Sequence, residues 1–159
     1  MQKPKHYEAL RECMVTRLGA VIVDGQEADD EVAIRMTKEP NKYLLVGVDK
    51  DLRQIPGWHH NPKKAETEYI DEFEAYRNFC LQLLTGDRVD NIPGLEGIGP
   101  VKAAKALKYA KTEEDLIGAV WKAYQEKEHG IEYLIEQGQL LWLRRYEGEL
   151  WRPPSSVKA

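Results

Sequence analysis

The chain has 159 residues, 42% of them hydrophobic and 31% charged, which suits a globular domain with a sizeable core. No apolar run reaches the roughly 20 residues of a membrane span, and residues 1–13 lack the apolar stretch of a signal peptide. The net charge of −4 weakly disfavours a nucleic-acid partner.

The first half of the chain alternates helical and strand patterns. These patterns predict helices over 4–18, 27–37 and 71–84, a helical turn over 51–55, and strands over 20–23 (AVIV), 43–48 (YLLVGV) and 65–70. Because YLLVGV is continuously apolar, we expect this strand to be buried on both faces, whereas the alternating segment 65–70 suits a sheet edge. Residues 1–86 are therefore predicted to form an α/β part with a small parallel sheet.

The second half of the chain is predicted to be helical. Apolar spacing indicates helices over 100–110, 112–127 and 130–146. Pro100 suits the first position of a helix, and Thr112 opens a capping-box pattern. We expect Trp151 to be packed, with a helical part over 87–153 and a tail over 154–159.

Seven acidic residues fall in three groups at the boundaries of these elements. The groups are Glu27, Asp29 and Asp30; Asp49 and Asp51; and Asp87 and Asp90. The second group directly follows the strand YLLVGV, and ligands of open α/β sheets bind at the carboxyl ends of strands. Carboxylates that converge there would repel one another unless cations lay among them. Because the groups contain no histidine or cysteine, the donor set favours Mg²⁺ or Mn²⁺ over zinc.

Two such ions, about 3.5–4 Å apart, are a standard arrangement for phosphodiester hydrolysis. Simpler explanations exist for each group taken alone. Asp29 and Asp30 early in a helix complement its dipole, and an aspartate after a strand often caps the next helix. With the seven acids set aside, 20 of the 27 acidic residues remain against 23 lysines and arginines, a balance of +3. The negative net charge therefore does not exclude DNA.

A glycine-rich turn, GLEGIGP, precedes the helix predicted over 100–110. Gly94, Gly97 and Gly99 allow backbone N–H groups to approach a phosphate, and the helix that follows adds positive potential. Lysines then recur at every third position, at Lys102, Lys105 and Lys108 and again at 111. We expect them to form a band along one side of the helix that grips a nucleic-acid backbone without reading sequence. A plain solvated lysine face is the alternative.

Three stretches taken together, EADD, VDKDL and GDRVDNIPGLEGIGPVKAAKAL, resemble the 5′ nuclease superfamily. The superfamily includes flap endonucleases, the 5′–3′ exonuclease domain of bacterial DNA polymerase I, and phage exonucleases, which the C-terminal segment resembles most. The resemblance covers residues 5–153 and implies a PIN-like domain whose first strand and helical arch are absent here. It also implies that the glycine turn belongs to a helix–three-turn–helix that holds duplex DNA and often binds K⁺.

Carried over by position, the resemblance places metal ligands at all seven acids. Glu27, Asp29 and Asp30 would serve mainly a first Mg²⁺ or Mn²⁺ ion, and Asp49, Asp51, Asp87 and Asp90 mainly a second. Asp30, Asp49 and Asp51 are the expected catalytic residues. The resemblance further implies the cytoplasm of a bacterium or of a phage-infected cell. Because family members begin with a strand, two further aspartates and the arch, a separate polypeptide is a candidate supplier of these parts.

Three functional hypotheses follow from the residues and the resemblance. The first is a metal-dependent 5′–3′ exonuclease or flap endonuclease acting on 5′-ended, flapped or branched DNA, completed by a partner fragment. The second is a catalytically inactive module that grips duplex DNA. The third, a small-molecule phosphatase or another α/β metal hydrolase, leaves the lysines unexplained. Retention of all seven carboxylates favours the first, because binding alone does not require so many acids close together.

Overall fold

The computed structural model describes residues 3–157, which form six α-helices, one 3-10 helix and three strands. In chain order these are α1 Tyr7–Leu18, α2 Ala28–Lys38, β1 Leu44–Val46, η1 Asp51–Gln54, β2 Gly57–Asn61, β3 Glu66–Ile70, α3 Glu72–Thr85, α4 Pro100–Ala106, α5 Glu113–Glu126 and α6 Ile131–Leu141. Within the described residues, no helix is both long and apolar enough to traverse a bilayer.

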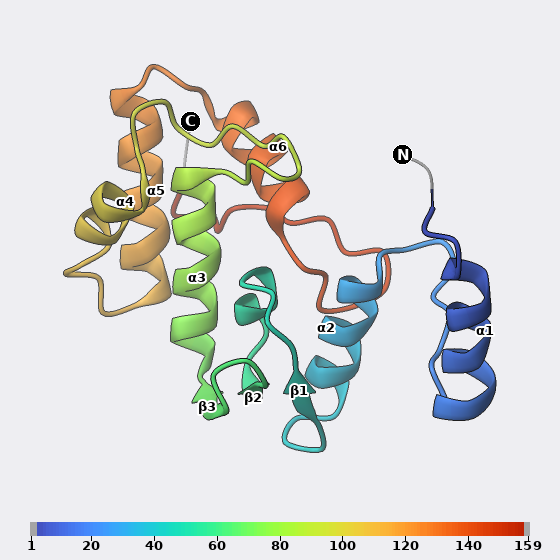
Figure 1. The fold of residues 1–159 in the computed structure, drawn as a ribbon. Coiled ribbons are helices and arrows are strands. Elements are labelled where there is room, and N and C mark those ends of the chain that lie inside the picture. Colours follow the sequence, from blue (N-terminus) through green and yellow to red (C-terminus); the bar gives the residue numbers. More distant parts are fainter. Residues whose placement is uncertain (1–2, 158–159) are drawn as a thin grey trace.

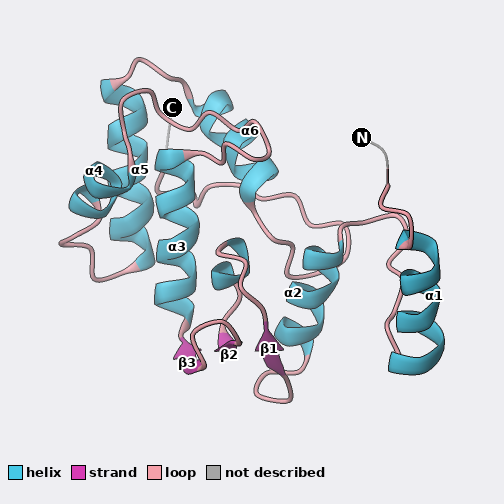
Figure 2. Cartoon of the chain, in the orientation of Figure 1, coloured by secondary structure: helices cyan, strands magenta, loops and turns pink. Residues whose placement is uncertain are grey.

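The three strands form one small sheet in the order β1-β2-β3. β1 runs parallel to β2, and β3 runs antiparallel to β2. Figure 1 shows the sheet at one end of α3, with α2 beside β1 and with α4, α5 and α6 gathered around the other end of α3. Figure 2 shows how little of the chain the strands occupy. The predicted mixed α/β class with a helical second part is confirmed.

Local sequence signals set several helix boundaries. Gly19 ends α1 in the left-handed conformation, with φ of 71°. Asp71 caps α3 by accepting a hydrogen bond from the Glu74 backbone N–H at 2.8 Å. Thr112 and Asp115 form the expected capping box at the start of α5.

The strand predictions were wrong at three places. Residues 20–23 form no strand, and Val21 and Ile22 are 65% and 53% exposed. β1 covers only three residues of the run 43–48 and buries only Leu45, because β2 is its single partner among the described strands. The central strand β2 was not predicted at all, since GWHHN shows no apolar alternation.

Two helices end earlier than predicted, and both ends matter for the site. α4 stops at Ala106 rather than at residue 110, so only two of the lysines lie on it. α6 stops at Leu141 because Trp142 and Leu143 turn away in extended conformation to pack against different parts of the core. This second change brings residues 142–145 beside the first half of the chain.

The larger of two cores lies between α3, α5 and α6. The Phe79 ring contacts Trp142 and Trp151 edge-on, at centroid distances of 4.8 and 5.2 Å. Trp151 is packed as predicted, and it lies directly over Gly138, where a Cβ would come within 2.1 Å of its ring. The Tyr124 hydroxyl donates to the Leu83 carbonyl oxygen at 2.7 Å and joins α5 to α3.

The smaller core connects the C-terminal segment to the α/β part. It consists of Ala33, Met36, Leu45, Ile55 and Leu143. Leu143 comes from the segment after α6, whereas the others come from α2, β1 and the end of η1. The segment after α6 is therefore held against the elements that carry the first two acidic groups.

Candidate metal centre and adjoining groove

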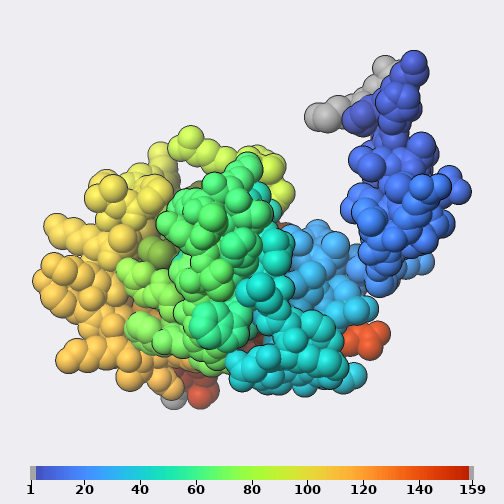
Figure 3. All heavy atoms as spheres, turned by 60° about the horizontal axis from the view of Figure 1, so that its bottom comes forward, coloured from blue at the N-terminus to red at the C-terminus, as the bar shows by residue number. Residues whose placement is uncertain are grey.

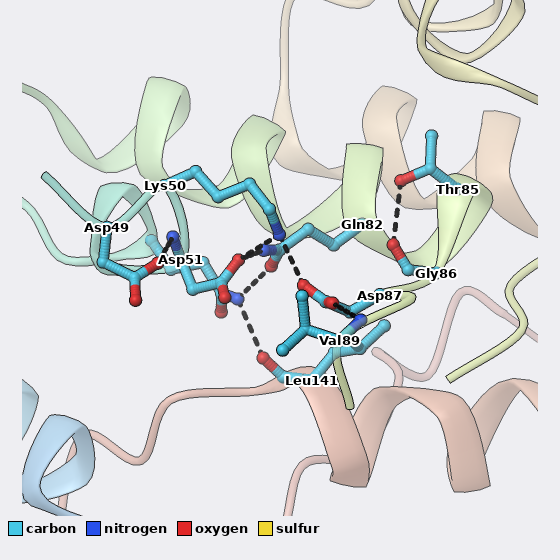
Figure 4. Close-up of polar contacts among 10 residues, drawn as sticks. Asp49, Lys50, Asp51, Gln82, Thr85, Gly86, Asp87, Val89 and Leu141 are labelled. Atoms are coloured by element: carbon cyan, nitrogen blue, oxygen red, sulfur yellow. Dashed lines mark hydrogen bonds and ion pairs between the residues drawn. The ribbon is translucent and has the colours of Figure 1, made fainter. Parts of the chain in front are cut away.

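The turn that follows α3 holds Asp87 in a fixed position. Its backbone N–H and carbonyl both pair with Ile92, at 2.8 and 2.7 Å. The Asp87 side chain is only 5% exposed, and its Oδ1 accepts the Val89 backbone N–H at 2.7 Å. The remaining oxygen, Oδ2, points toward η1 (Figure 4).

Three carboxylates meet beside this turn. Among the described residues, Asp51, Asp87 and Asp90 each offer an oxygen within 4.8 Å of the others. Asp51 opens η1, while Asp87 and Asp90 lie in the turn after α3, so segments far apart in sequence supply the group. Carboxylate oxygens at this separation suit a single hard cation such as Mg²⁺ or Mn²⁺.

A lysine ammonium stands among these carboxylates. Lys50 Nζ donates to Asp51 Oδ1 at 2.9 Å and also to Asp87 Oδ2 (Figure 4). Burial alone would lower the pKa of Lys50, but its bonds to the two carboxylates outweigh this and raise the pKa to about 12. In turn, the hydrogen bond from Lys50 lowers the pKa of Asp87. The ammonium thus lies between two of the three carboxylates, which shows that the cluster accommodates a cation.

Asp29 and Asp49 lie close to this cluster. Burial raises the pKa of Asp29, and the negative charges of Asp49, Asp51 and Asp30 raise it further. Asp49 Oδ1 accepts the Asp51 backbone N–H at 3.0 Å, although the N-cap residue of η1 is Lys50. The first turn of α2 and the start of η1 thus add to one region of strong negative charge.

The other two predicted ligands are placed differently. Asp30 is buried and is held by the C-terminal segment: its Oδ1 accepts the Arg144 backbone N–H at 2.9 Å, and its Oδ2 lies 3.5 Å from Arg144 Nε. Glu27 is exposed at the N-cap position of α2 and makes no capping hydrogen bond there. The structure therefore groups Asp51, Asp87 and Asp90, sets Asp29 and Asp49 nearby, and gives Asp30 and Glu27 other surroundings.

Sequence reasoning missed the donors that orient these acids. Gln82 on α3 donates to Asp51 Oδ1, and Gln54 at the end of η1 donates to Gln82 Oε1. Lys50 carried a signal, because it stands between Asp49 and Asp51 in the sequence. A lone glutamine on a helix face carries none.

The glycine turn combines a packing requirement with an open backbone. Gly94 has φ of +62°, and a Cβ there would lie 2.2 Å from the Gly86 backbone nitrogen, so the close crossing of two chain segments requires this glycine. Gly97 and Gly99 are exposed, and a Cβ at Gly99 would meet nothing within 4 Å. Their backbone is therefore open to a ligand, as the phosphate interpretation requires.

The lysines form a shorter band than predicted. Lys102 and Lys105 are exposed on α4, and Lys102 Nζ donates to the Gly97 carbonyl oxygen at 2.8 Å. Lys108 lies beyond the end of α4, where its ammonium is 5.3 Å from the Tyr109 ring. The positive charge is consequently concentrated at the glycine turn rather than along a long helix.

A groove of about 1280 Å³ runs from Asp87, one acid of the cluster, to the glycine turn. Lys50 and Asp87 line one part of it, and Gly97, Gly99 and Ala104 line another. Asp87 and the open backbone of the turn therefore face the same groove.

Comparisons with known proteins show which proteins the chain resembles. No model of a protein family matches the chain. Flap endonuclease Xni of Shewanella sp. (strain W3-18-1) is 30% identical over 124 residues, which cover 70% of this chain and 47% of that protein. The 5′-3′ exonuclease of Aquifex aeolicus (strain VF5) is 33% identical over 115 residues, covering 65% and 39%. DNA polymerase I of Borreliella burgdorferi is 35% identical over 104 residues, covering 57% and 12%.

This chain thus spans about half or less of the length of these curated relatives. Among solved structures, the crystal structure of the T5 D15 protein, co-crystallised with metal ions, matches with a TM-score of 0.58 and 17% identity. The match covers 88% of this chain and 64% of that one, and at this identity it shows the shared fold.

Proposed function

Since the chain belongs to the 5′ nuclease superfamily, we propose that it takes part in the metal-dependent hydrolysis of DNA phosphodiesters at 5′ ends, flaps or branches. The observation that carries this proposal is the convergence of Asp51, Asp87 and Asp90, whose carboxylate oxygens lie within 4.8 Å of one another. Asp87 of this cluster lines the groove that leads to the glycine turn.

The residues of the cluster would hold Mg²⁺ or Mn²⁺. The donor set is all oxygen, and the Lys50 ammonium already pairs there with Asp51 and Asp87. Asp49, Asp51, Asp87 and Asp90 would hold one ion, and the acids at the start of α2, Glu27, Asp29 and Asp30, a second. When bound, such ions supply a lowered pKa for the attacking water and positive charge beside the phosphodiester oxygens.

The chain's own residues have two further tasks in this proposal. Asp87 is kept in place by its backbone pairing with Ile92, so the cluster is organised before substrate arrives. The open backbone of Gly97 and Gly99, with Lys102 and Lys105 beside it, would hold the phosphate backbone of duplex DNA. A K⁺ ion bound at this turn would contact the same phosphate backbone.

We also propose that a separate polypeptide covers the open face of the sheet. Leu44, Trp58 and Tyr69 are neighbours across the three strands, and their side chains are 52%, 46% and 51% exposed. The outer edge of β1 carries no described strand, and the exposed Val21 and Ile22 lie in a segment without regular structure. A polypeptide that adds a strand at the edge of β1 and lays apolar side chains over this face would satisfy both the backbone of β1 and these side chains.

The helix α1 also exposes apolar side chains. All twelve of its residues are described and none is buried, although Tyr7, Leu10, Met14 and Leu18 follow one another at helical spacing. Figure 3 shows the N-terminal residues as a column that projects from the rest of the molecule. An unpartnered apolar stripe of this kind is expected to pack against the same polypeptide.

A cleavage assay on a 5′-flap DNA with Mg²⁺ or Mn²⁺ tests the proposal. The chain is assayed alone and together with an N-terminal fragment of a family member that carries the first strand and arch. We expect cleavage to appear or to rise with the fragment, and to stop with EDTA. Absence of cleavage in both mixtures, with duplex binding retained, would instead identify a DNA-binding module.

A further inference from the structure

A buried glutamine joins the segment after α6 to the candidate metal centre. Gln54 is only 1% exposed. Its Nε2 donates to the Leu141 carbonyl oxygen at 2.8 Å, and its Oε1 accepts the Leu143 backbone N–H at 3.4 Å. Both bonds reach residues 87 or more positions away in sequence, so the Gln54 amide is fixed by the start of the C-terminal segment rather than by its own surroundings on η1.

The same amide extends toward the acids through a second glutamine. Gln54 Nε2 also donates to Gln82 Oε1, and Gln82 Nε2 donates to Asp51 Oδ1 (Figure 4). The orientation of each amide dictates that of the next, because an amide that accepts at its oxygen presents its nitrogen on the other side. We name this chain of hydrogen bonds, from Leu141 through Gln54 and Gln82 to Asp51, the amide relay.

The segment after α6 is itself anchored, so the relay has a firm origin. Leu143 is buried in the smaller core, and the Trp142 ring packs against Phe79. Arg145 donates to the Gln54 carbonyl oxygen from its guanidinium, and the Arg144 backbone N–H binds Asp30. One short stretch therefore contacts two of the acidic groups, directly at Asp30 and through the relay at Asp51.

We propose that Gln54 and Gln82 are positioning residues that set the orientation of Asp51 toward the cation, with the segment after α6 as their support. This inference rests on the metal chemistry proposed above and deepens it. Hydrogen bonds to a ligating carboxylate fix its rotation, and loss of such partners typically weakens metal binding about 10–100-fold. The two glutamines are neutral, so removing them changes orientation without changing the charge of the centre.

Titration of Mn²⁺ into the full chain by calorimetry, beside thermal unfolding in EDTA, tests the relay. Gln82→Met keeps the length of the side chain but removes its hydrogen bonds. We expect Mn²⁺ binding about 10–100-fold weaker with little change in unfolding temperature. Gln54→Met should weaken Mn²⁺ binding similarly. The double variant should bind Mn²⁺ no more weakly than the single variant with the lower affinity, because the two glutamines act in series. Gln125→Met, on an exposed position of α5, is the matched control and should bind as wild type does.

The outcomes separate the relay from the metal proposal. If wild type binds Mn²⁺ and Gln82→Met binds it equally well, the relay is overturned and the metal site stands. Losses that simply add in the double variant would show two independent structural effects and also overturn the relay. If wild type binds no Mn²⁺, the metal proposal fails and the relay fails with it. Gln82 is only half-buried, so its variant decides the matter even if Gln54→Met does not fold.

Discussion

Asp87 is the most buried of the seven candidate carboxylates, and its donors explain how a buried charge is tolerated. The Val89 N–H and the Lys50 ammonium both donate to it, so the carboxylate is paired and hydrogen-bonded as buried charges must be. The sequence identified these acids as candidates because their grouping at element boundaries is visible. Their donors could not, since the glutamines of the relay meet Asp51 only through the tertiary fold.

Replacing Lys50 tests whether its ammonium occupies the position of a metal ion. In the Lys50→Met variant, Asp51 and Asp87 lose an internal cation that Mn²⁺ would otherwise have to displace. We expect Mn²⁺ to bind more tightly by severalfold, and the metal-free protein to unfold at a lower temperature because the acids then repel one another. Calorimetric titration measures the first effect. Lys64→Met, on an exposed lysine of the β2–β3 turn, is the control; unchanged affinity in Lys50→Met would contradict the competition.

The glycine at position 94 gives a stability prediction of a different kind. Gly94→Ala would place a Cβ 2.2 Å from the Gly86 nitrogen, in a left-handed backbone. Backbone strain of about 1–2 kcal/mol and overpacking of about 1–3 kcal/mol both oppose folding. We expect the free energy of unfolding to fall by about 3 kcal/mol or more in urea denaturation. Gly148→Ala shares the positive φ but meets nothing within 4 Å, so it should show the strain alone. Equal losses in the two variants would refute the packing argument.

Among the elements, β2 shows where local pattern fails and why. Its sequence, GWHHN, has a glycine, two histidines and an asparagine, none of which favours a strand. The strand forms because β1 and β3 pair with it from both sides and because His59 points inward, where its Nε2–H donates to the Ile55 carbonyl oxygen at 2.7 Å. By contrast α3 and α5 carry both amphipathic spacing and caps, and the sequence predicts them closely.

The buried imidazole of His59 makes this element sensitive to acid. Burial lowers its pKa below the ordinary value near 6.5, so between the two values the unfolded chain binds more protons than the folded one. The stability that neutral His59 contributes is therefore fully present above about pH 6.5, and it declines as the pH falls below this value. In His59→Gln, whose amide can still donate to Ile55, we expect urea midpoints to change less between pH 7.5 and 5.5. His60→Gln should keep the wild-type dependence; the same dependence in His59→Gln would refute this assignment.

At the scale of the whole molecule, α3 joins the two parts. β3 leads directly into it, η1, α4, α5 and α6 contact it, and the turn that follows it supplies Asp87 and Asp90. The order of motifs along the chain indicated this division at residue 86, which stays a prediction as a domain boundary. The return of residues 142–145 to the α/β part was not predictable. It depends on the tertiary packing of Trp142 against the larger core and of Leu143 in the smaller one.

The groove leads from Asp87 to the glycine turn and the start of α4, and α4 carries the exposed Lys102 and Lys105. The molecule as a whole therefore predicts a salt-dependent grip on DNA. In the variant Lys102→Ala with Lys105→Ala, each lost phosphate contact should reduce the slope of log K against log salt by about 0.9. We therefore expect a slope smaller in magnitude by about 2 and weaker binding to duplexes of any sequence, measured by fluorescence anisotropy between low and moderate salt. The pair Lys63→Ala and Lys64→Ala, on the exposed β2–β3 turn away from this groove, should leave the slope unchanged. A wild-type slope in the first variant would remove α4 from the interface and leave the acidic cluster without a neighbouring grip on DNA.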